Sequence, residues 1–257
     1  MSHRVLLMDG IHNFRDYGGY GAADGRRVKR RVLWRSGQHL DATPDDLARV
    51  DALDLAHVID FRGSGERREY PCPRGPAFGA SVICYDGETA ALAPHVEAGG
   101  GTLGVEEAHR RMEAIYLALP DREPVLWVMR RYFDALAGGE GASLVHCLAG
   151  KDRTGMAVAL LHHVLGVHPD DAMADFLLTN TAGNLDARVE AGGAAIRAKW
   201  GNVPDETIRV LMGVDARYLV AMRKAVEERH GSLDAFVRDV LGVDDTKREA
   251  LRLHLTE

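Results

Sequence analysis

One stretch constrains this chain more than any other: residues 145–159, which read VHCLAGKDRTGMAVA. The apolar run from Ser143 to His146 predicts a short strand that ends at Cys147. Five residues separate Cys147 from Arg153, and an apolar helical pattern follows from Thr154. A strand, a tight loop and a helix in this order predict a phosphate-binding loop that carries its own nucleophile.

The predicted loop contains the groups that hydrolysis of a phosphate ester requires. Backbone N–H groups at a helix N-terminus bind phosphate, and the same position favours the thiolate form of a cysteine. We expect Cys147 to attack phosphorus and form a phosphocysteine, while Arg153 binds the equatorial oxygens with its planar fork. The predicted phosphate-binding residues are Leu148, Ala149, Gly150, Lys151, Asp152, Arg153 and Thr154.

Four residues in or beside the loop have supporting roles in this prediction. Gly150 lets the backbone curve inward without a side chain. Lys151 adds a second cation, and Thr154 offers its hydroxyl to the cysteine sulfur. His146 is predicted to position the loop rather than to act as a base.

The leaving alkoxide needs a proton, which a carboxylic acid near the loop must supply. Asp152 lies inside the loop and is the carboxyl group closest to Cys147 in the sequence. Asp60 and Asp86, each near the end of a predicted strand, are the alternative acids.

Composition and cysteine usage narrow the class of protein further. The formal net charge of -6 argues against nucleic acid as a partner bound through bulk charge. Three cysteines without a CxxC pair suggest a reducing compartment, so we predict a cytoplasmic protein, with leaderless secretion as the alternative. The sequence contains no run of 18 apolar residues, so we expect no stable membrane insertion. The sequence predicts no metal site, no cofactor and no particular oligomeric state.

The order of predicted elements indicates an α/β fold. Strands at residues 28–33, 56–61, 81–85 and 143–146 alternate with helices at about 43–53, 105–118, 122–137 and 154–165. From residue 169 onward the pattern is helical. We therefore expect a central, mostly parallel sheet flanked by helices, with a helical C-terminal third, in a single domain over residues 1–257.

The loop and five other segments resemble the cysteine-dependent protein tyrosine phosphatase superfamily. HCLAGKDRTG resembles the active-site loop of its bacterial branch, whose members act on phosphotyrosine, phosphoserine or phosphothreonine, and phosphoinositides. The other segments that resemble the family are NFRDYGG, LWRSG, VIDFR, DFLLTN and YLVAMRKAVEERHGSLDAFV. The resemblance covers most of the chain, and it implies a phosphatase-like fold.

The resemblance also implies roles for individual residues. Cys147 would be the nucleophile, Arg153 the phosphate ligand and Asp152 the general acid. Lys151 beside Asp152 is similar to the loops of phosphoinositide phosphatases. The residues that would lie around the pocket are Phe14, Arg15, Asp60 and Arg62. Residues 86–118 would correspond to a mobile lid.

The predicted function is therefore a phosphomonoester hydrolase, foremost a protein-tyrosine phosphatase with serine/threonine and phosphoinositide activity. Its partners would be phosphorylated proteins or phosphoinositides as substrates. A phosphoinositide or inositol-phosphate phosphatase and a non-catalytic phosphate-binding module are the alternatives. Sulfur or arsenate chemistry on a similar loop is a third alternative. The Lys-Asp-Arg-Thr sequence argues against it, because persulfide transfer usually does not require these residues.

Overall fold

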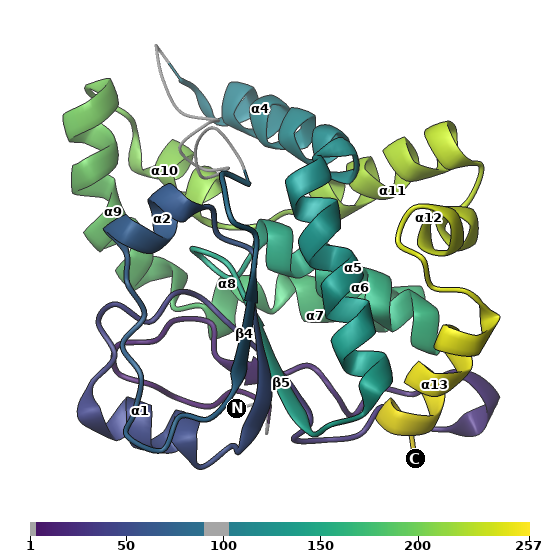
Figure 1. Ribbon diagram of the computed structural model, residues 1–257. Helices are drawn as coiled ribbons and strands as arrows, with labels where there is room; N and C mark the ends of the chain where they lie inside the picture. The colour runs from purple at the N-terminus through teal and green to yellow at the C-terminus, as the bar shows by residue number, and fades with distance from the viewer. Residues whose placement is uncertain (1–3, 90–102) are drawn as a thin grey trace.

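The computed structural model describes residues 4–89 and 103–257 of the chain. It contains a five-stranded sheet with the strand order β1–β2–β5–β3–β4. Figure 1 shows this sheet with helices on either side. β1 is antiparallel to β2, and the other neighbours are parallel, which confirms the predicted sheet. The strands are β1 (Arg15–Asp16), β2 (Leu33–Ser36), β3 (Leu55–Asp60), β4 (Ser81–Cys84) and β5 (Ala142–His146).

Helices surround this sheet and make up the C-terminal third, as predicted. Those before residue 166 are α1 (Pro44–Asp51), α2 (Ser64–Glu69), α4 (Val105–Ala118), α5 (Glu123–Gly138) and α6 (Asp152–Leu165). Those after it are α7 (Pro169–Leu177), α8 (Thr179–Ala182), α9 (Leu185–Trp200), α10 (Asp205–Met212), α11 (Ala216–His230), α12 (Leu233–Asp239) and α13 (Asp245–Leu255).

The two faces of the sheet are buried in two apolar cores, because successive residues of a strand point to opposite faces. Val58 of β3 lies beside Leu144 of β5, and both belong to the smaller core, which also contains Val50 of α1. Their successors Ile59 and Val145 belong to the larger core, which α4, α5, α6 and α11 help to form. Burial on both faces fits the continuous apolar pattern of β3 and β5.

Local signals explain where two helices begin. Thr43 caps α1 as predicted: its hydroxyl accepts from the Asp46 N–H at 3.2 Å, and the Asp46 carboxylate accepts from the Thr43 N–H at 3.1 Å. α6 begins at Asp152, two residues before the predicted start. The N–H of Gly155 donates to the carbonyl of Lys151 at 2.7 Å, so Asp152 and Arg153 lie in the first helical turn.

The predicted strand over residues 28–33 is wrong in its boundaries. β2 instead covers Leu33–Ser36. Arg31 adopts a φ of 63°, which interrupts the extended run before Leu33. Val28 forms an isolated bridge with Thr256 near the C-terminus instead of pairing with a neighbouring strand.

The segment expected to be a lid is described only in part. Residues 90–102 lie outside the described residues. Residues 105–118 form α4, and Ala108, Met112 and Tyr116 are buried in the larger core. This part of the segment is therefore a packed helix.

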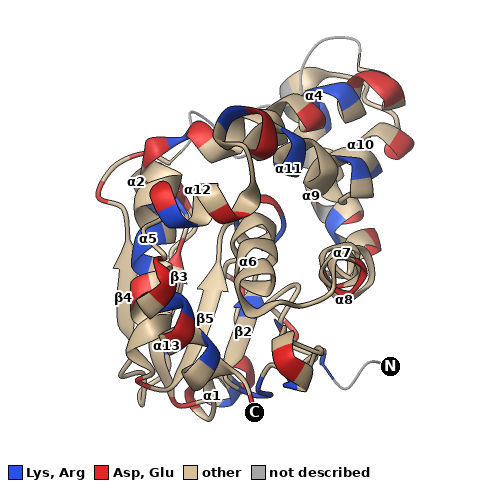
Figure 2. Ribbon diagram, turned by 90° about the vertical axis from the view of Figure 1, so that its right-hand side faces the viewer, with Lys and Arg blue, Asp and Glu red and all other residues tan. Residues whose placement is uncertain are grey.

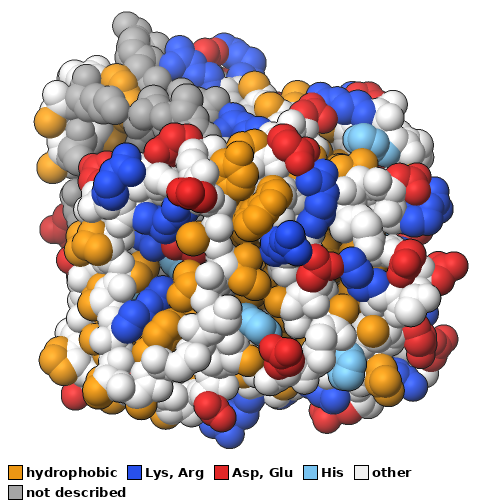
Figure 3. Space-filling model, viewed as in Figure 1, with side chains coloured by type: hydrophobic (Ala, Val, Ile, Leu, Met, Phe, Trp, Pro, Cys, Tyr) orange, Lys and Arg blue, Asp and Glu red, His pale blue; other side chains and the backbone are white. Residues whose placement is uncertain are grey.

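The outer helices carry both signs of charge (Figure 2). On α4, Glu107 pairs with Arg110 and Arg111, and on α11 Arg223 pairs with Glu227. The face in Figure 3 likewise intersperses basic and acidic side chains. Exposed pairs of this kind contribute only a few tenths of a kcal/mol each. Within residues 4–89 and 103–257, no helix has the length and apolar character needed to span a membrane.

Candidate active site

The loop that follows β5 begins with Cys147, at the carboxyl end of the central strand of the sheet, and then turns sharply into α6. The cysteine is 2% exposed. Gly150 has a φ of +66°, and a Cβ built on it would lie 2.2 Å from the carbonyl oxygen of Ser36. Only glycine fits this position without strain, because other residues would meet both the left-handed backbone penalty and the clash.

Two carbonyls of the loop are held from outside. The Leu148 carbonyl accepts from the N–H of Gln38 at 2.9 Å. The Gly150 carbonyl accepts from Asn13 Nδ2 at 2.7 Å and from Arg35 Nη2 at 3.0 Å. In a trans peptide the next N–H points opposite to the carbonyl, so the N–H groups of residues 149 and 151 point away from these donors. This arrangement directs N–H groups to the inner side of the loop, where an anion can be bound.

A buried ion cluster fixes the donors that hold the loop. Asp175 of α7 accepts from Arg35 Nη1 at 2.7 Å, and its carbonyl accepts from Arg15 Nη2 at 2.8 Å. Arg15 also donates to the side chain of Asn13. Burial favours a neutral Asp175, but the two arginines overcome it and hold the pKa of that carboxyl well below its ordinary value. Arg15, expected near the pocket, therefore lies behind the loop and supports it.

Arg153 is oriented by an acidic partner that the sequence did not indicate. Its Nη1 and Nη2 donate to the two oxygens of Glu66 in α2 at 2.6 and 2.7 Å. Nη1 also donates to Thr89 and to the carbonyl of Phe61. Burial acts to lower the pKa of Arg153, yet the ion pair with Glu66 raises it, so the guanidinium stays charged. Nε has no partner among the described residues.

Asp152 is held by two neighbours in the first turn of α6. The hydroxyl of Tyr116 donates to Asp152 Oδ1 at 2.8 Å, and Lys151 Nζ lies 3.5 Å from the same oxygen. Lys151 Nζ also donates to the carbonyls of Leu211 and Gly213, at 2.6 and 3.1 Å. The lysine, expected as a cation for phosphate, is thus fully buried and bound to the C-terminal end of α10. Sequence reasoning missed Tyr116 as a partner of Asp152.

A second ion pair lies beside the strand end that precedes Cys147. Both carboxylate oxygens of Asp60 accept hydrogen bonds from Arg62, and the Nε2 of His146 lies 3.8 Å from Asp60 Oδ2. Burial opposes ionisation of Asp60, but His146 and Arg62 lower its pKa to about 2. Burial lowers the pKa of His146 to about 4, so the ring is neutral at neutral pH. An ionised Asp60 is poorly suited to donate a proton, and the other alternative acid, Asp86, is exposed.

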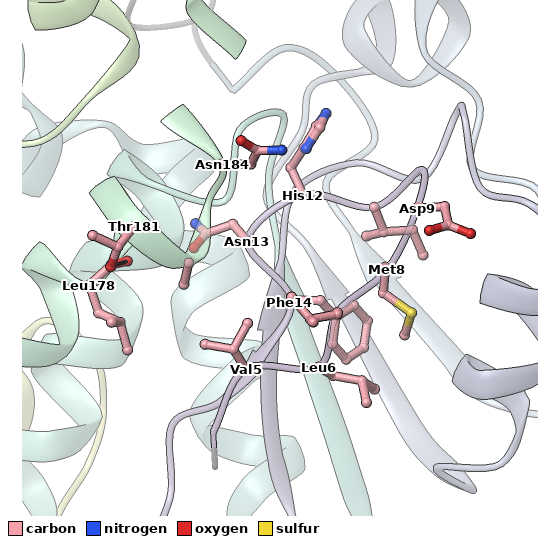
Figure 4. Close-up of a pocket in the computed structure, with 13 residues that line it drawn as sticks. Val5, Leu6, Met8, Asp9, His12, Asn13, Phe14, Leu178, Thr181 and Asn184 are labelled. Carbon is pink, nitrogen blue, oxygen red and sulfur yellow. Dashed lines mark hydrogen bonds between the residues drawn. The ribbon is translucent and has the colours of Figure 1, made fainter. Parts of the chain in front are cut away.

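The remaining predicted residues differ in position. Thr154 is buried at the start of α6, and its hydroxyl has no partner within the described part of the chain. Leu148 and Ala149 are half-buried. Phe14 is buried against Trp34 and lines a pocket of about 690 Å³ between the N-terminal segment and α8 (Figure 4). None of residues 147–153 lines this pocket, but Asn13 does, and its side chain binds the Gly150 carbonyl, so the pocket lies beside the loop.

Some of the missed residues carried a signal and others did not. Asn13, Arg35 and Asp175 lie within segments that resemble the phosphatase family, so their support of the loop could have been anticipated. Glu66 and Tyr116 are 87 and 36 residues from their partners Arg153 and Asp152, and no local pattern links them. Within the described residues, no group of three or more His, Cys, Asp or Glu side chains is arranged to hold a metal ion.

Comparisons with known proteins show the family of this chain. Residues 6–257 match the model of the Tyrosine phosphatase family. The chain is 36% identical to "Putative tyrosine-protein phosphatase H16_A0669" of Cupriavidus necator, with 93% of this chain and 85% of that protein covered. It is 32% identical to the "Triple specificity protein phosphatase PtpB" of Mycobacterium tuberculosis, with 91% and 93% covered.

Among solved structures, the crystal structure of P. aeruginosa TpbA matches with a TM-score of 0.38 and 17% identity, covering 82% of this chain and 97% of that one. The family match spans nearly the whole chain, and the loop of Cys147 and Arg153 lies inside it. This chain belongs to the tyrosine phosphatase family and is a tyrosine phosphatase.

Proposed function

We propose that this phosphatase hydrolyses phosphate monoesters through a phosphocysteine at Cys147. The thiolate attacks phosphorus, and the bond from phosphorus to the leaving oxygen breaks as Asp152 transfers its proton to that oxygen. Water then attacks the phosphocysteine, Asp152 takes up a proton from it, and inorganic phosphate leaves as the thiolate is restored. Arg153 and the N–H groups of residues 148–153 bind the phosphoryl oxygens in both steps.

One observation carries this proposal: Cys147 begins a loop in which two carbonyls are held from outside and the arginine is oriented by Glu66. A site prepared in this way binds a dianionic tetrahedral group without reorganising, which is what transition-state stabilisation requires. Tyr116 holds the carboxyl of Asp152 in the first turn of α6, which supports the role of Asp152 as the acid.

For substrates, we place phosphotyrosine in protein first, with phosphoserine and phosphothreonine as further substrates. The family match and the name of the mycobacterial relative support this order. Phosphoinositide hydrolysis is the second candidate, because the Lys-Asp pair of the HCLAGKDRTG loop resembles the loops of phosphoinositide phosphatases. Parallel kinetics on a phosphotyrosine peptide, a phosphoserine peptide and a phosphoinositide would rank these substrates. A cytoplasmic location and a single domain over the whole chain are part of the same proposal.

The decisive experiment replaces Cys147 by serine. Cys147→Ser should reduce hydrolysis of 4-nitrophenyl phosphate and of a phosphotyrosine peptide to background, because serine is a far weaker nucleophile here. Brief incubation of the wild type with ³²P-labelled phosphopeptide, followed by denaturation, should leave label on the protein, and Cys147→Ser should leave none. The matched variant Cys84→Ser, changed at the half-buried end of β4, should keep both activity and label.

Two outcomes would contradict this function. Activity that survives in Cys147→Ser would mean that another group is the nucleophile. A wild-type protein that binds phosphopeptide but hydrolyses no phosphate ester would be a binding module.

A further inference from the structure

Arg188, in the first turn of α9, is a buried cation that no neighbour satisfies. Its backbone N–H donates to the Asn184 carbonyl at 3.1 Å, which anchors the residue in the helix. The side chain is 5% exposed, and its Nε, Nη1 and Nη2 all lack a hydrogen-bond partner in the described residues. A buried guanidinium is costly without partners, so such a group calls for a ligand. By contrast, the other buried arginines near the loop, Arg15, Arg35 and Arg153, are each paired with a carboxylate.

The neighbours of Arg188 place it beside the phosphate-binding loop. Burial lowers the pKa of Arg188 to about 10 against the opposing effect of the Asp152 carboxylate, so the side chain is charged at neutral pH. Its charge in turn acts to lower the pKa values of Lys151 and His12, both already lowered by burial. Glu66 neutralises the charge of Arg153. This leaves Lys151 and Arg188 with one carboxylate between them, that of Asp152. The surroundings of Asp152 therefore carry surplus positive charge.

The pocket beside the loop connects Arg188 with the general acid. The carboxylate of Asp152 is the charged group that acts on the pKa of Arg188, and Asn13, which lines the pocket, binds the carbonyl of Gly150, two residues before Asp152. An acid must meet the leaving oxygen, so a cation beside that acid lies near the leaving alcohol. Two residues around Arg188, His12 and Asn184, also line the pocket beside the loop (Figure 4). Gly183 gives the guanidinium room, because a Cβ there would come within 3.2 Å of Nη2.

We propose that Arg188 forms a second anion subsite, which binds a carboxylate or phosphate carried by the leaving alcohol of the substrate. The substrate class is then a phosphate monoester with a second anionic group close to the scissile ester. This inference rests on the proposed phosphatase function and adds a determinant of specificity to it. The planar fork of arginine suits two-point binding of either anion.

The test compares two aryl phosphates whose leaving groups have similar acidity: phenyl phosphate and 3-carboxyphenyl phosphate. The wild type should prefer the carboxylated ester in kcat/KM. Arg188→Gln should reduce that preference by about tenfold or more, mainly through KM, because a charge-assisted hydrogen bond is lost. Arg188→Lys, which keeps the charge but not the fork, should fall between the two. The control Arg197→Gln changes an exposed arginine of the same helix and should keep the wild-type preference.

The outcomes separate this inference from the function on which it rests. Equal preference ratios in the wild type and Arg188→Gln, with both folded by circular dichroism, would overturn the subsite. An equal loss on both esters would assign Arg188 to the scissile phosphate or to the structure, and would overturn it as well. Absence of hydrolysis of either ester by the wild type would instead contradict the proposed function. If the subsite is confirmed, an ester with a phosphate in place of the carboxylate on the same ring would show which of the two anions the subsite prefers.

Discussion

The guanidinium of Arg153 is held in place before any phosphate arrives. Its two terminal nitrogens donate hydrogen bonds to Glu66, Thr89 and the carbonyl of Phe61, whereas Nε has no partner in the described residues. A side chain as flexible as arginine loses about 2 kcal/mol of rotamer freedom when it is fixed. Because Glu66 fixes it during folding, this cost would not weaken the phosphate binding that we propose for Arg153.

At the same scale, Asp152 can be tested as the general acid. Asp152→Asn preserves shape and can still accept the hydrogen bond from Tyr116, but it has no proton to donate. We expect kcat for phosphoserine, an alkyl phosphate, to fall by about 10²–10⁴-fold. The fall for 4-nitrophenyl phosphate should be far smaller, since its leaving group needs no proton. Steady-state kinetics on the two substrates provide the measurement.

The exposed alternative acid supplies the control for this prediction. Asp86→Asn should leave the ratio of alkyl to aryl rates unchanged. If Asp152→Asn slowed both substrates equally, or if Asp86→Asn changed the ratio, the proton would come from a residue other than Asp152.

How far single residues could be predicted depends on their separation in the chain. Cys147 and Arg153 are six positions apart, so spacing alone indicated their shared role. Glu66 and Tyr116 come from α2 and α4, and only the tertiary fold brings them to the loop. Lys151 was predicted to bind phosphate, but its buried ammonium donates to the carbonyls of Leu211 and Gly213, a contact that no local pattern encodes.

Among the elements, the turn between β5 and α6 is the most constrained. We predict that Gly150→Ala destabilises the protein by about 3 kcal/mol or more, since a left-handed backbone costs about 1–2 kcal/mol and the Ser36 carbonyl leaves no room. Gly242→Ala is the matched control: its φ is +70°, but no atom lies within 4 Å of the added Cβ. It should cost only the backbone penalty of about 1–2 kcal/mol. Urea unfolding of both variants measures the difference, and equal costs would refute the steric argument.

Element boundaries followed the sequence wherever a local signal existed. α1 has its Thr43 cap and its proline, and β3 and β5 are continuous apolar runs buried on both faces of the sheet. β2 was misplaced because the left-handed residue Arg31 decides where the strand can begin, and arginine gives no warning of that conformation. α6 started early because the loop itself supplies the first helical hydrogen bond.

Across the whole molecule, the sheet and the C-terminal helices meet at the site, and this assembly lies beyond local sequence patterns. α7 contributes Asp175 to the support of the loop, and α10 contributes the carbonyls that hold Lys151. The final residues return to the N-terminal region, where the N–H of Arg27 donates to the Glu257 carbonyl at 2.8 Å. The family resemblance predicted that distant segments act together, but not which atoms meet.

Stability of the whole molecule should fall as the solution is acidified below neutral pH. Burial lowers the pKa of His146 from its ordinary value of 6.5 to about 4, and it lowers those of His39 and His162 in the same direction. Between these values the unfolded chain binds more protons than the folded one, so acid favours unfolding. His146 alone should account for about 2 kcal/mol of lost unfolding free energy between pH 7 and pH 5.

The contribution of His146 can be isolated by comparing how steeply the unfolding free energy of each variant changes with pH. Glutamine takes up no proton in this range, so His146→Gln should lose about 2 kcal/mol less than the wild type between pH 7 and pH 5, whatever its stability at pH 7. His168→Gln, changed at an exposed histidine, should show the wild-type slope. Urea unfolding at both pH values provides the free energies. Parallel slopes for the wild type and His146→Gln would mean that His146 takes up its proton without unfolding, and that Asp60, 3.8 Å away, is able to stabilise the charged ring.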